Sequence, residues 1–189
     1  MPSTDADLVR QCLDGDDRAF AVLVERHGAA VWGAVREIVR EAEDVKDVVQ
    51  ESFISAYRAL PGFRGEAQFR TWLLKIAHNA ALSRAQQRAR RRETYTQEED
   101  GDDMDALPAS DRLPDEHLSA IEIEERLSRL IDDLPGHYRV VLVLYYYEEL
   151  TYKEIAEVVG RPINTVKAHI RRAKIRLGEL VGAEFVPGE

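Results

Sequence analysis

The side chains best placed to bind a charged ligand are the cations near the C-terminal end of the chain. Six Lys or Arg residues and no carboxylate fall between Arg161 and Leu177, although the chain of 189 residues has a formal net charge of −9 at pH 7. A cluster of one sign in a chain of the opposite sign is typical of a surface that binds nucleic-acid phosphates. A solvated, charged helix face is the alternative interpretation.

The elements around these cations favour the first interpretation. Thr151 is followed three residues later by Glu154, the spacing of a capping box, so a helix is expected to start at Thr151. Gly160 permits the left-handed conformation in which helices often end, and Pro162 prevents simple continuation. Asn164 is then expected to cap a second helix. Two helices joined by a short turn form a helix-turn-helix, which indicates DNA as the partner.

The second helix is expected to have an apolar inner face and a cationic outer face. Val166, Ile170, Ala173 and Leu177 recur at helical spacing and form the inner face. The first turns of such a helix usually meet base edges, and later positions more often touch phosphates. We expect base contacts from Thr165, Lys167, Ala168, His169 and Arg171, and phosphate contacts from Arg172, Lys174 and Arg176. Asn164, at the start of the helix, is expected to lie on the same DNA-binding surface.

Charge divides the chain into three parts. Residues 1–92 carry 15 basic and 13 acidic side chains, residues 93–125 carry 1 and 13, and residues 126–189 carry 10 and 9. The acidic character therefore belongs to the middle segment. Helical periodicity dominates on both sides of it, and no alternating pattern indicates a strand. We expect an all-α protein with two small helical domains, at 1–92 and 118–182, joined by a flexible acidic linker at 93–117 and followed by a tail at 183–189.

A helix expected at residues 43–60 has an unusually acidic side. Asp44, Asp47 and Glu51 follow one another at intervals of three and four residues, with Gln50 alongside. Like charges at this spacing destabilise an isolated helix. The favourable positive end of the helix dipole explains Asp44, but Glu51 lies two turns further along. A solvated face and a contact with a basic protein partner are both consistent with this pattern.

Another helix of the N-terminal domain, expected at residues 69–92, mixes aromatic, amide and cationic side chains. Such a mixture suits single-stranded DNA, because rings stack on bases while cations follow the phosphates. The alternative places the aromatic rings in the core and leaves the arginines as a solvated tail. The candidate DNA contacts on this helix are Arg70, Trp72, Lys75, Asn79, Arg84, Arg88 and Arg91.

Several functional classes find no support in the sequence. The five histidines show no metal-ligand spacing, and no phosphate-binding loop or nucleophile motif is present, so we expect no catalytic residue, metal or cofactor. Cys12 is the single cysteine, which fits a reducing cytosol. No apolar run approaches the roughly 20 residues that a membrane span needs. A cytoplasmic protein without membrane insertion is expected.

Five segments together resemble the extracytoplasmic-function (ECF) sigma factors, small bacterial initiation factors with only the second and fourth conserved sigma regions. The matching segments are GDDRAFAVLVERH at 15–27, AEDVKDVVQESFISAYRAL at 42–60, FRGEAQFRTWLLKIAHNAAL at 63–82, LPGHYRVVLVLYYYEELTYKEIAEVVG at 134–160 and TVKAHIRRAKIRL at 165–177. The resemblance implies a factor that directs core RNA polymerase to promoters and helps to melt the −10 element. A stand-alone helix-turn-helix regulator is the alternative, and it leaves the N-terminal domain without a role.

The resemblance also implies partners for the surfaces already described. Asp44, Asp47, Gln50 and Glu51 would dock on the clamp helices of the largest polymerase subunit, with the polymerase flap as a second contact. Asn79 and a loop would contact bases of the opened −10 element, and the helix from Asn164 would enter the major groove at the −35 element. The loop residues are Phe63, Arg64, Gly65, Glu66 and Ala67. An anti-sigma factor is a further expected partner.

The chain departs from the residues common in the family at His78, Arg161, Asn164, Ala168 and His169. Arg or Lys is common at the first of these positions. Most of the departures lie on the side expected to read DNA, so the fold is implied and the promoter sequence is not.

Overall fold

The computed structural model of the chain describes residues 3–96 and 129–185, and all regular secondary structure in these ranges is helical. The elements are α1 (Asp5–Leu13), α2 (Asp17–Arg36), α3 (Ala42–Ala59), the short 3-10 helix η1 (Leu60–Gly62), α4 (Phe69–Thr96), α6 (Gly136–Tyr146), α7 (Tyr152–Val159) and α8 (Ile163–Phe185). A helical turn at 129–132 precedes α6. The all-α fold is therefore confirmed, while the acidic segment at 93–117 lies largely outside the described residues.

Capping residues mark the start of α2 and both ends of α7. The side chain of Asp16 accepts a hydrogen bond from the backbone N–H of Arg18 at 3.0 Å, which fixes the start of α2. At α7, the backbone N–H of Thr151 donates to the Glu154 carboxylate at 2.8 Å, and the Thr151 hydroxyl accepts from the Glu154 N–H at 3.3 Å. Gly160 ends α7 with a φ of 63°, in the left-handed region that glycine adopts without strain. The predicted capping box and turn are confirmed.

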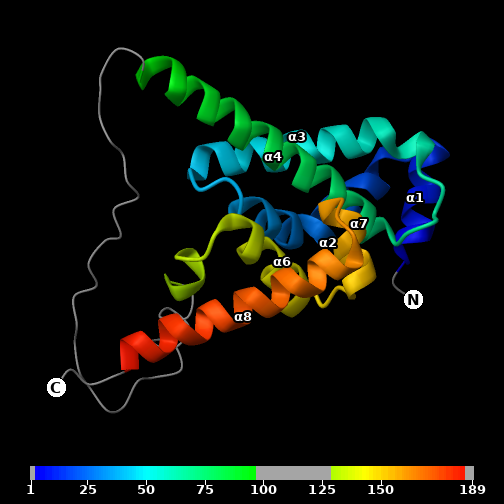
Figure 1. The fold of residues 1–189 in the computed structure, drawn as a ribbon. Coiled ribbons are helices and arrows are strands. Elements are labelled where there is room, and N and C mark those ends of the chain that lie inside the picture. Colours follow the sequence, from blue (N-terminus) through cyan, green and yellow to red (C-terminus); the bar gives the residue numbers. More distant parts are fainter. Residues whose placement is uncertain (1–2, 97–128, 186–189) are drawn as a thin grey trace.

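The N-terminal lobe packs α1 to α4 around a common core (Figure 1). α2, α3 and α4 pack against one another, and α1 lies against α2. The fully buried side chains of this lobe include Leu23, Val31, Val35, Val48, Ala56, Leu73, Leu74, Ala77 and Ala81. They recur at three- and four-residue intervals along their helices, which is why these faces point inward.

The C-terminal lobe rests α7 and α8 on α6. Its buried residues include Val141, Leu144, Ile155, Val158, Val166, Ile170 and Ala173. The predicted inner face of the second helix of the helix-turn-helix is thus confirmed, with Leu177 only half-buried.

One continuous hydrophobic cluster joins the two lobes. It contains Leu74 of α4 together with Val141 of α6, Ile155 of α7 and Ile170 of α8. α7 packs against α4, and α6 contacts α2. Figure 1 shows α7 beside the first half of α4, while the second half of α4 extends away from the other helices.

Two boundaries differ from the sequence expectation. Asn164 does not cap α8, because the helix already begins at Ile163. The carbonyl of Pro162 accepts hydrogen bonds from the N–H groups of Thr165 at 2.9 Å and Val166 at 3.2 Å, so the proline occupies the capping position. α4 continues to Thr96 rather than ending at residue 92. Within residues 3–96 and 129–185, no helix has both the length and the apolar composition that crossing a membrane requires.

Candidate nucleic-acid and protein-binding surfaces

The outer face of α8 carries the predicted cations. Val166, Ile170 and Ala173 are buried against the lobe, which turns the positions between them outward. The exposed members of the predicted set are Asn164, Lys167, Arg171, Arg172, Lys174 and Arg176, and the half-buried members are Thr165, Ala168 and His169. Arg176 approaches the Glu179 carboxylate at 3.4 Å. The result is an open, positively charged helix face of the kind that lies along a phosphate backbone.

Two of these lysines lie over tyrosine rings of α6 and α7. The Lys167 ammonium lies 5.9 Å from the centroid of the Tyr152 ring, and that of Lys174 lies 5.8 Å from Tyr145 and 5.1 Å from Tyr146. These distances allow cation–π attraction. A hydrogen bond with Tyr146 raises the pKa of Lys174, so its ammonium stays charged. Sequence analysis did not identify this tyrosine support, although the three consecutive tyrosines at 145–147 were an available signal.

His169 belongs to an aromatic group at the start of α6. Its ring centroid lies 5.2 Å from that of His137 and 5.7 Å from that of Tyr138. Burial lowers the pKa of His169, and the neighbouring His137, Arg172 and Arg161 lower it further. Near pH 7 the imidazole is therefore neutral and offers one donor and one acceptor.

An aromatic cluster supports the loop before α4. The ring of Phe63 lies edge-on to Phe69, with centroids 5.8 Å apart, and 5.0 Å from Trp72. Phe69 is buried, whereas Phe63 and Trp72 are half-buried. Gly65 has a φ of 71°, which allows the tight turn between them and the exposed loop residues. Arg64 and Glu66 are exposed and Ala67 is half-buried, so the loop presents polar groups above an aromatic base.

The predicted DNA contacts on α4 occupy different environments. Lys75 and Asn79 are exposed and one turn apart, so they share a face. Arg70 is half-buried and forms an ion pair with Glu148 of the C-terminal lobe. His78, which departs from the family pattern, is buried with 6% of its surface exposed rather than placed on a DNA-reading surface. The side chain of Arg91 lies outside the described part of the structure.

The acidic side of α3 is paired with arginines from α4. Arg84 lies 2.6 Å from Asp44, 3.8 Å from Asp47 and 3.9 Å from Glu51. Arg88 lies 2.7 Å from Asp44. The structure thus brings together two sets that the sequence analysis assigned to different partners. Asp44 faces both arginines, whereas Asp47 and Glu51 keep 65% and 64% of their side chains exposed.

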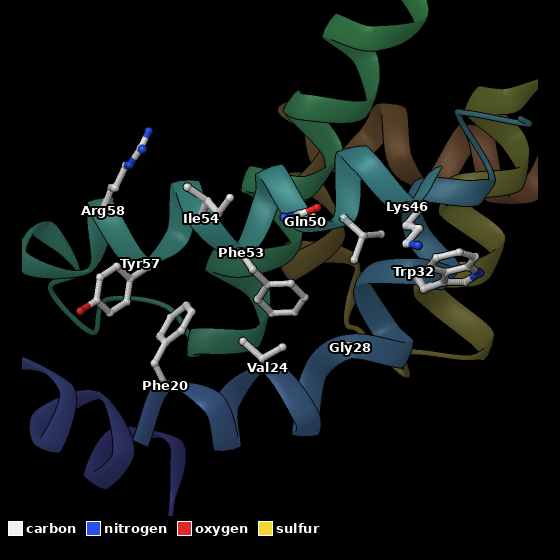
Figure 2. Close-up of a pocket in the computed structure, with 11 residues that line it drawn as sticks. Phe20, Val24, Gly28, Trp32, Lys46, Gln50, Phe53, Ile54, Tyr57 and Arg58 are labelled. Carbon is white, nitrogen blue, oxygen red and sulfur yellow. The ribbon is translucent and has the colours of Figure 1, made fainter. Parts of the chain in front are cut away.

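Gln50 lies on a different side of α3, at an apolar groove between α2 and α3. The groove has a volume of about 800 Å³. Figure 2 shows Phe20 and Val24 of α2 facing Phe53 and Tyr57 of α3 across it. Trp32 and Ile54 line the groove and are 42% and 43% exposed. Apolar side chains that remain this exposed along one hollow are typical of a surface that receives a protein partner.

The chain matches two family models, Sigma-70 region 2 over residues 23–91 and Sigma-70 region 4 over residues 124–177. It is 36% identical over 173 residues to the RNA polymerase sigma-H factor of Pseudomonas aeruginosa, covering 90% of each chain. It is 34% identical over 174 residues to the ECF RNA polymerase sigma-E factor of Haemophilus influenzae, covering 90% of this chain and 92% of that one.

Solved structures show a similar fold. The structure of CnrH in complex with the cytosolic domain of CnrY matches with a TM-score of 0.66 and 29% identity, covering 96% of this chain and 99% of that one. The sigma factor RpoE of Bartonella quintana, solved with the anti-sigma factor NepR, matches with a TM-score of 0.64 and 21% identity, covering 86% and 96%. The matched regions include both lobes described above.

Proposed function

The chain belongs to the ECF family of RNA polymerase sigma factors, and from this premise we propose which of its surfaces carries each step of promoter recognition. As a sigma factor it is a transcription initiation factor that directs core polymerase to specific promoters. The observation that supports this most strongly is the match to relatives over 90% of both chains, because it includes both lobes rather than the helix-turn-helix alone.

The −35 element is the ligand of α8. Asn164, Lys167 and Arg171 are exposed on its first turns, where a recognition helix meets base edges. Arg172, Lys174 and Arg176 follow on the phosphate side. Since Tyr146 and Tyr145 hold the Lys174 ammonium, this lysine is positioned before DNA arrives.

The opened −10 element is the ligand of the loop at Phe63 to Ala67 and of the exposed face of α4. The loop stands on an aromatic base, which suits an unstacked nucleotide, and Asn79 and Lys75 provide an amide and a cation along the strand. Trp72 supports the loop through its contacts with Phe63 and Phe69. Arg84 and Arg88 serve chiefly to hold α4 on α3 through Asp44.

Core polymerase docks on α3 through Asp47, Gln50 and Glu51. The two carboxylates remain exposed beside Arg84, and Gln50 opens onto the α2–α3 groove, so two neighbouring sides of α3 provide acidic and apolar contacts. Catalysis of RNA synthesis belongs to the polymerase, and the chain acts in the cytoplasm where the polymerase works. An anti-sigma protein is a further partner, by analogy with the RpoE factor solved with NepR.

Reconstituted transcription tests this function. Purified chain added to core polymerase should give starts at one promoter class selected from a random DNA library. Reversing both charges with Asp47→Lys and Glu51→Lys should weaken core binding about tenfold or more, because like charges then face the basic partner surface. Glu25→Lys, a charge reversal at an exposed position on α2, is the control and should bind core normally. A stand-alone regulator would bind duplex DNA without producing any promoter-specific start.

A further inference from the structure

The N-terminal helix α1 has no part in the surfaces proposed above, although it packs beside one of them. It lies against α2 and also contacts η1, the short turn that leads into the loop at Phe63 to Ala67. Figure 1 shows α1 next to the turn between α3 and α4. The match to Sigma-70 region 2 begins at residue 23, so α1 precedes the matched segment. A role for α1 therefore follows only from its own contacts.

Asp5, in the first turn of α1, connects this helix to a buried histidine of α2. One carboxylate oxygen of Asp5 lies 2.8 Å from Nε2 of His27, and the other accepts a hydrogen bond from Arg26 at 2.5 Å. A carboxylate only accepts hydrogen bonds, so Nε2 of His27 carries the proton and donates it. His27 has 6% of its surface exposed, whereas the Asp5 side chain keeps 27% exposed. α1 thus binds a buried imidazole from the edge of the lobe.

The hydrogen bond to Asp5 sets the state of the His27 ring. Burial lowers the pKa of His27 more than the nearby Asp5 raises it, and Arg70 and Arg26 lower it further. The imidazole is therefore neutral near pH 7 and has a single N–H. Since this N–H donates to Asp5, α1 determines both the tautomer and the orientation of the ring.

The His27 ring in turn touches the aromatic cluster beneath the proposed −10 loop. It lies against Phe69, with centroids 5.5 Å apart. Phe69 is buried and contacts Trp72 at 5.7 Å and Phe63 at 5.8 Å. Phe63 is the first residue of the loop, and Trp72 packs against it. A continuous series of contacts therefore joins Asp5 on α1 to the rings on which the loop rests.

A polar ring is an unusual choice at this buried position. Burying a polar group costs free energy unless it is hydrogen-bonded, so an apolar side chain of similar size would serve packing at least as well. What the imidazole adds is a directed bond to α1. Because protein interiors are close-packed, a ring held in one orientation also fixes the rings packed against it.

We propose that Asp5 and His27 are positioning residues for the −10 loop: α1 orients the imidazole, and the imidazole holds Phe69 beneath Phe63 in the arrangement that receives an unstacked base. Neither residue needs to contact DNA for this role. The inference rests on the proposed function of the loop. It assigns α1 to strand opening rather than to polymerase docking.

Strand opening by the holoenzyme tests this role. The probe is a promoter selected from the random DNA library, with 2-aminopurine in its −10 element, whose fluorescence rises when the base unstacks. Asp5→Ala removes the acceptor for His27 and should slow opening about tenfold, the factor expected when a hydrogen bond to a charged group is lost. Asp5→Asn keeps an acceptor oxygen on a side chain of the same shape and should restore the wild-type rate. His27→Phe keeps a ring against Phe69 without the N–H and should be as slow as Asp5→Ala.

Arg26→Ala is the matched control. Arg26 is exposed and pairs with the same carboxylate and with the backbone carbonyl of Ser3, so its removal leaves the His27 hydrogen bond in place. This variant should open the promoter at the wild-type rate, and all four variants should bind core polymerase normally.

Equal opening rates for Asp5→Ala and Asp5→Asn would overturn the proposal, because a positioning role requires the acceptor and a general effect on the fold does not. A loss of opening matched by an equal loss of core binding would also overturn it. The proposed function has a separate test in the wild-type chain. If that chain gave no promoter-specific start, the function itself would fail, whereas normal opening by every variant would refute only the role of α1.

Discussion

His78 lies on the buried side of α4, and its Nδ1 has no hydrogen-bond partner. Burial lowers the pKa of this imidazole to about 4, so it is neutral in the folded chain at pH 7. In the unfolded chain it titrates near its ordinary value of about 6.5. Between these two pH values the unfolded chain therefore binds more protons than the folded chain. The free energy of unfolding consequently decreases as the pH falls.

The first prediction follows from this difference. Stability contributed by neutral His78 is complete above pH 6.5 and is lost as the pH falls toward 4, by up to roughly 3 kcal/mol for a pKa difference of about 2.5. His78→Met should remove that loss, because the thioether does not titrate. Urea unfolding of both proteins between pH 4 and 7.5 measures the effect. Since other groups titrate equally in both proteins, a constant difference across the range would contradict the prediction.

At the residue scale, the sequence predicted the cations of α8 but not the tyrosine rings that lie beside two of them. Lys167, Arg171 and Lys174 follow from helical spacing, because the apolar positions between them must face inward. The pairing of Asp44 with Arg84 and Arg88 joins residues about 40 positions apart. Spacing along one helix contains no information on which neighbour its charged side will meet, so the acidic residues remained open to two interpretations.

At the scale of elements, the two halves of α4 are attached differently. The first half packs its apolar side chains into the core, and the second half is attached to α3 by ion pairs. Leu73, Leu74 and Ala77 are fully buried, whereas the arginines of the second half reach back to the start of α3. The ion pairs of Asp44 with Arg84 and Arg88 offset the mutual repulsion of acidic groups on α3. They also attach the extended part of α4 to the lobe.

The second prediction concerns this attachment. Asp44→Asn removes the shared carboxylate charge, and each partly exposed ion pair contributes up to about 1 kcal/mol. We expect the amides of α4 beyond Arg84 to exchange with solvent several-fold faster, while those around Leu73 stay protected. Hydrogen exchange read by mass spectrometry measures both regions of one helix. Glu43→Gln is the matched control on the same turn, and equal exchange in both variants would show that Asp44 does not anchor α4.

Capping signals predicted the helix-turn-helix well because they are local. Thr151, Glu154 and Gly160 act within one or two turns, and the structure places them as expected. The prediction that Asn164 caps α8 was wrong, because the Pro162 carbonyl already accepts hydrogen bonds from N–H groups in the first turn of α8. The sequence alone does not fix which of residues 162–164 takes the capping position, because that depends on the backbone path through the turn.

At the scale of the whole molecule, the division into two lobes was foreseen from charge, and their contact was not. The acidic segment marks a change in composition, which separates the lobes along the chain. Their interface depends on a three-dimensional match between Glu37 after α2 and Arg139 on α6, and on Gly33 facing Glu148. No sequence motif marks these residues as contacts between the lobes, because single glycines and glutamates are common in helical proteins.

A larger side chain at Gly33 should disturb the contact between the two lobes. A Cβ at Gly33 would lie 3.9 Å from the Glu148 carboxylate, which is ordinary contact, so Gly33→Ala should keep the packing of α6 on α2. Gly33→Trp places a ring in the same space and should force α6 away from α2. Overpacking of this kind should lower the free energy of unfolding of the Gly33→Trp chain by about 1–3 kcal/mol.

Urea unfolding of the Gly33→Trp and Gly33→Ala chains measures this loss. The Gly33→Ala chain is the control because it changes the same position without filling the interface. Circular dichroism shows whether the Gly33→Trp chain keeps its helices before urea is added. Equal free energies of unfolding for the two variants would contradict close packing of α6 on α2 at Gly33, whereas a loss in the Gly33→Trp chain alone would show that the space beside Gly33 is filled by the other lobe.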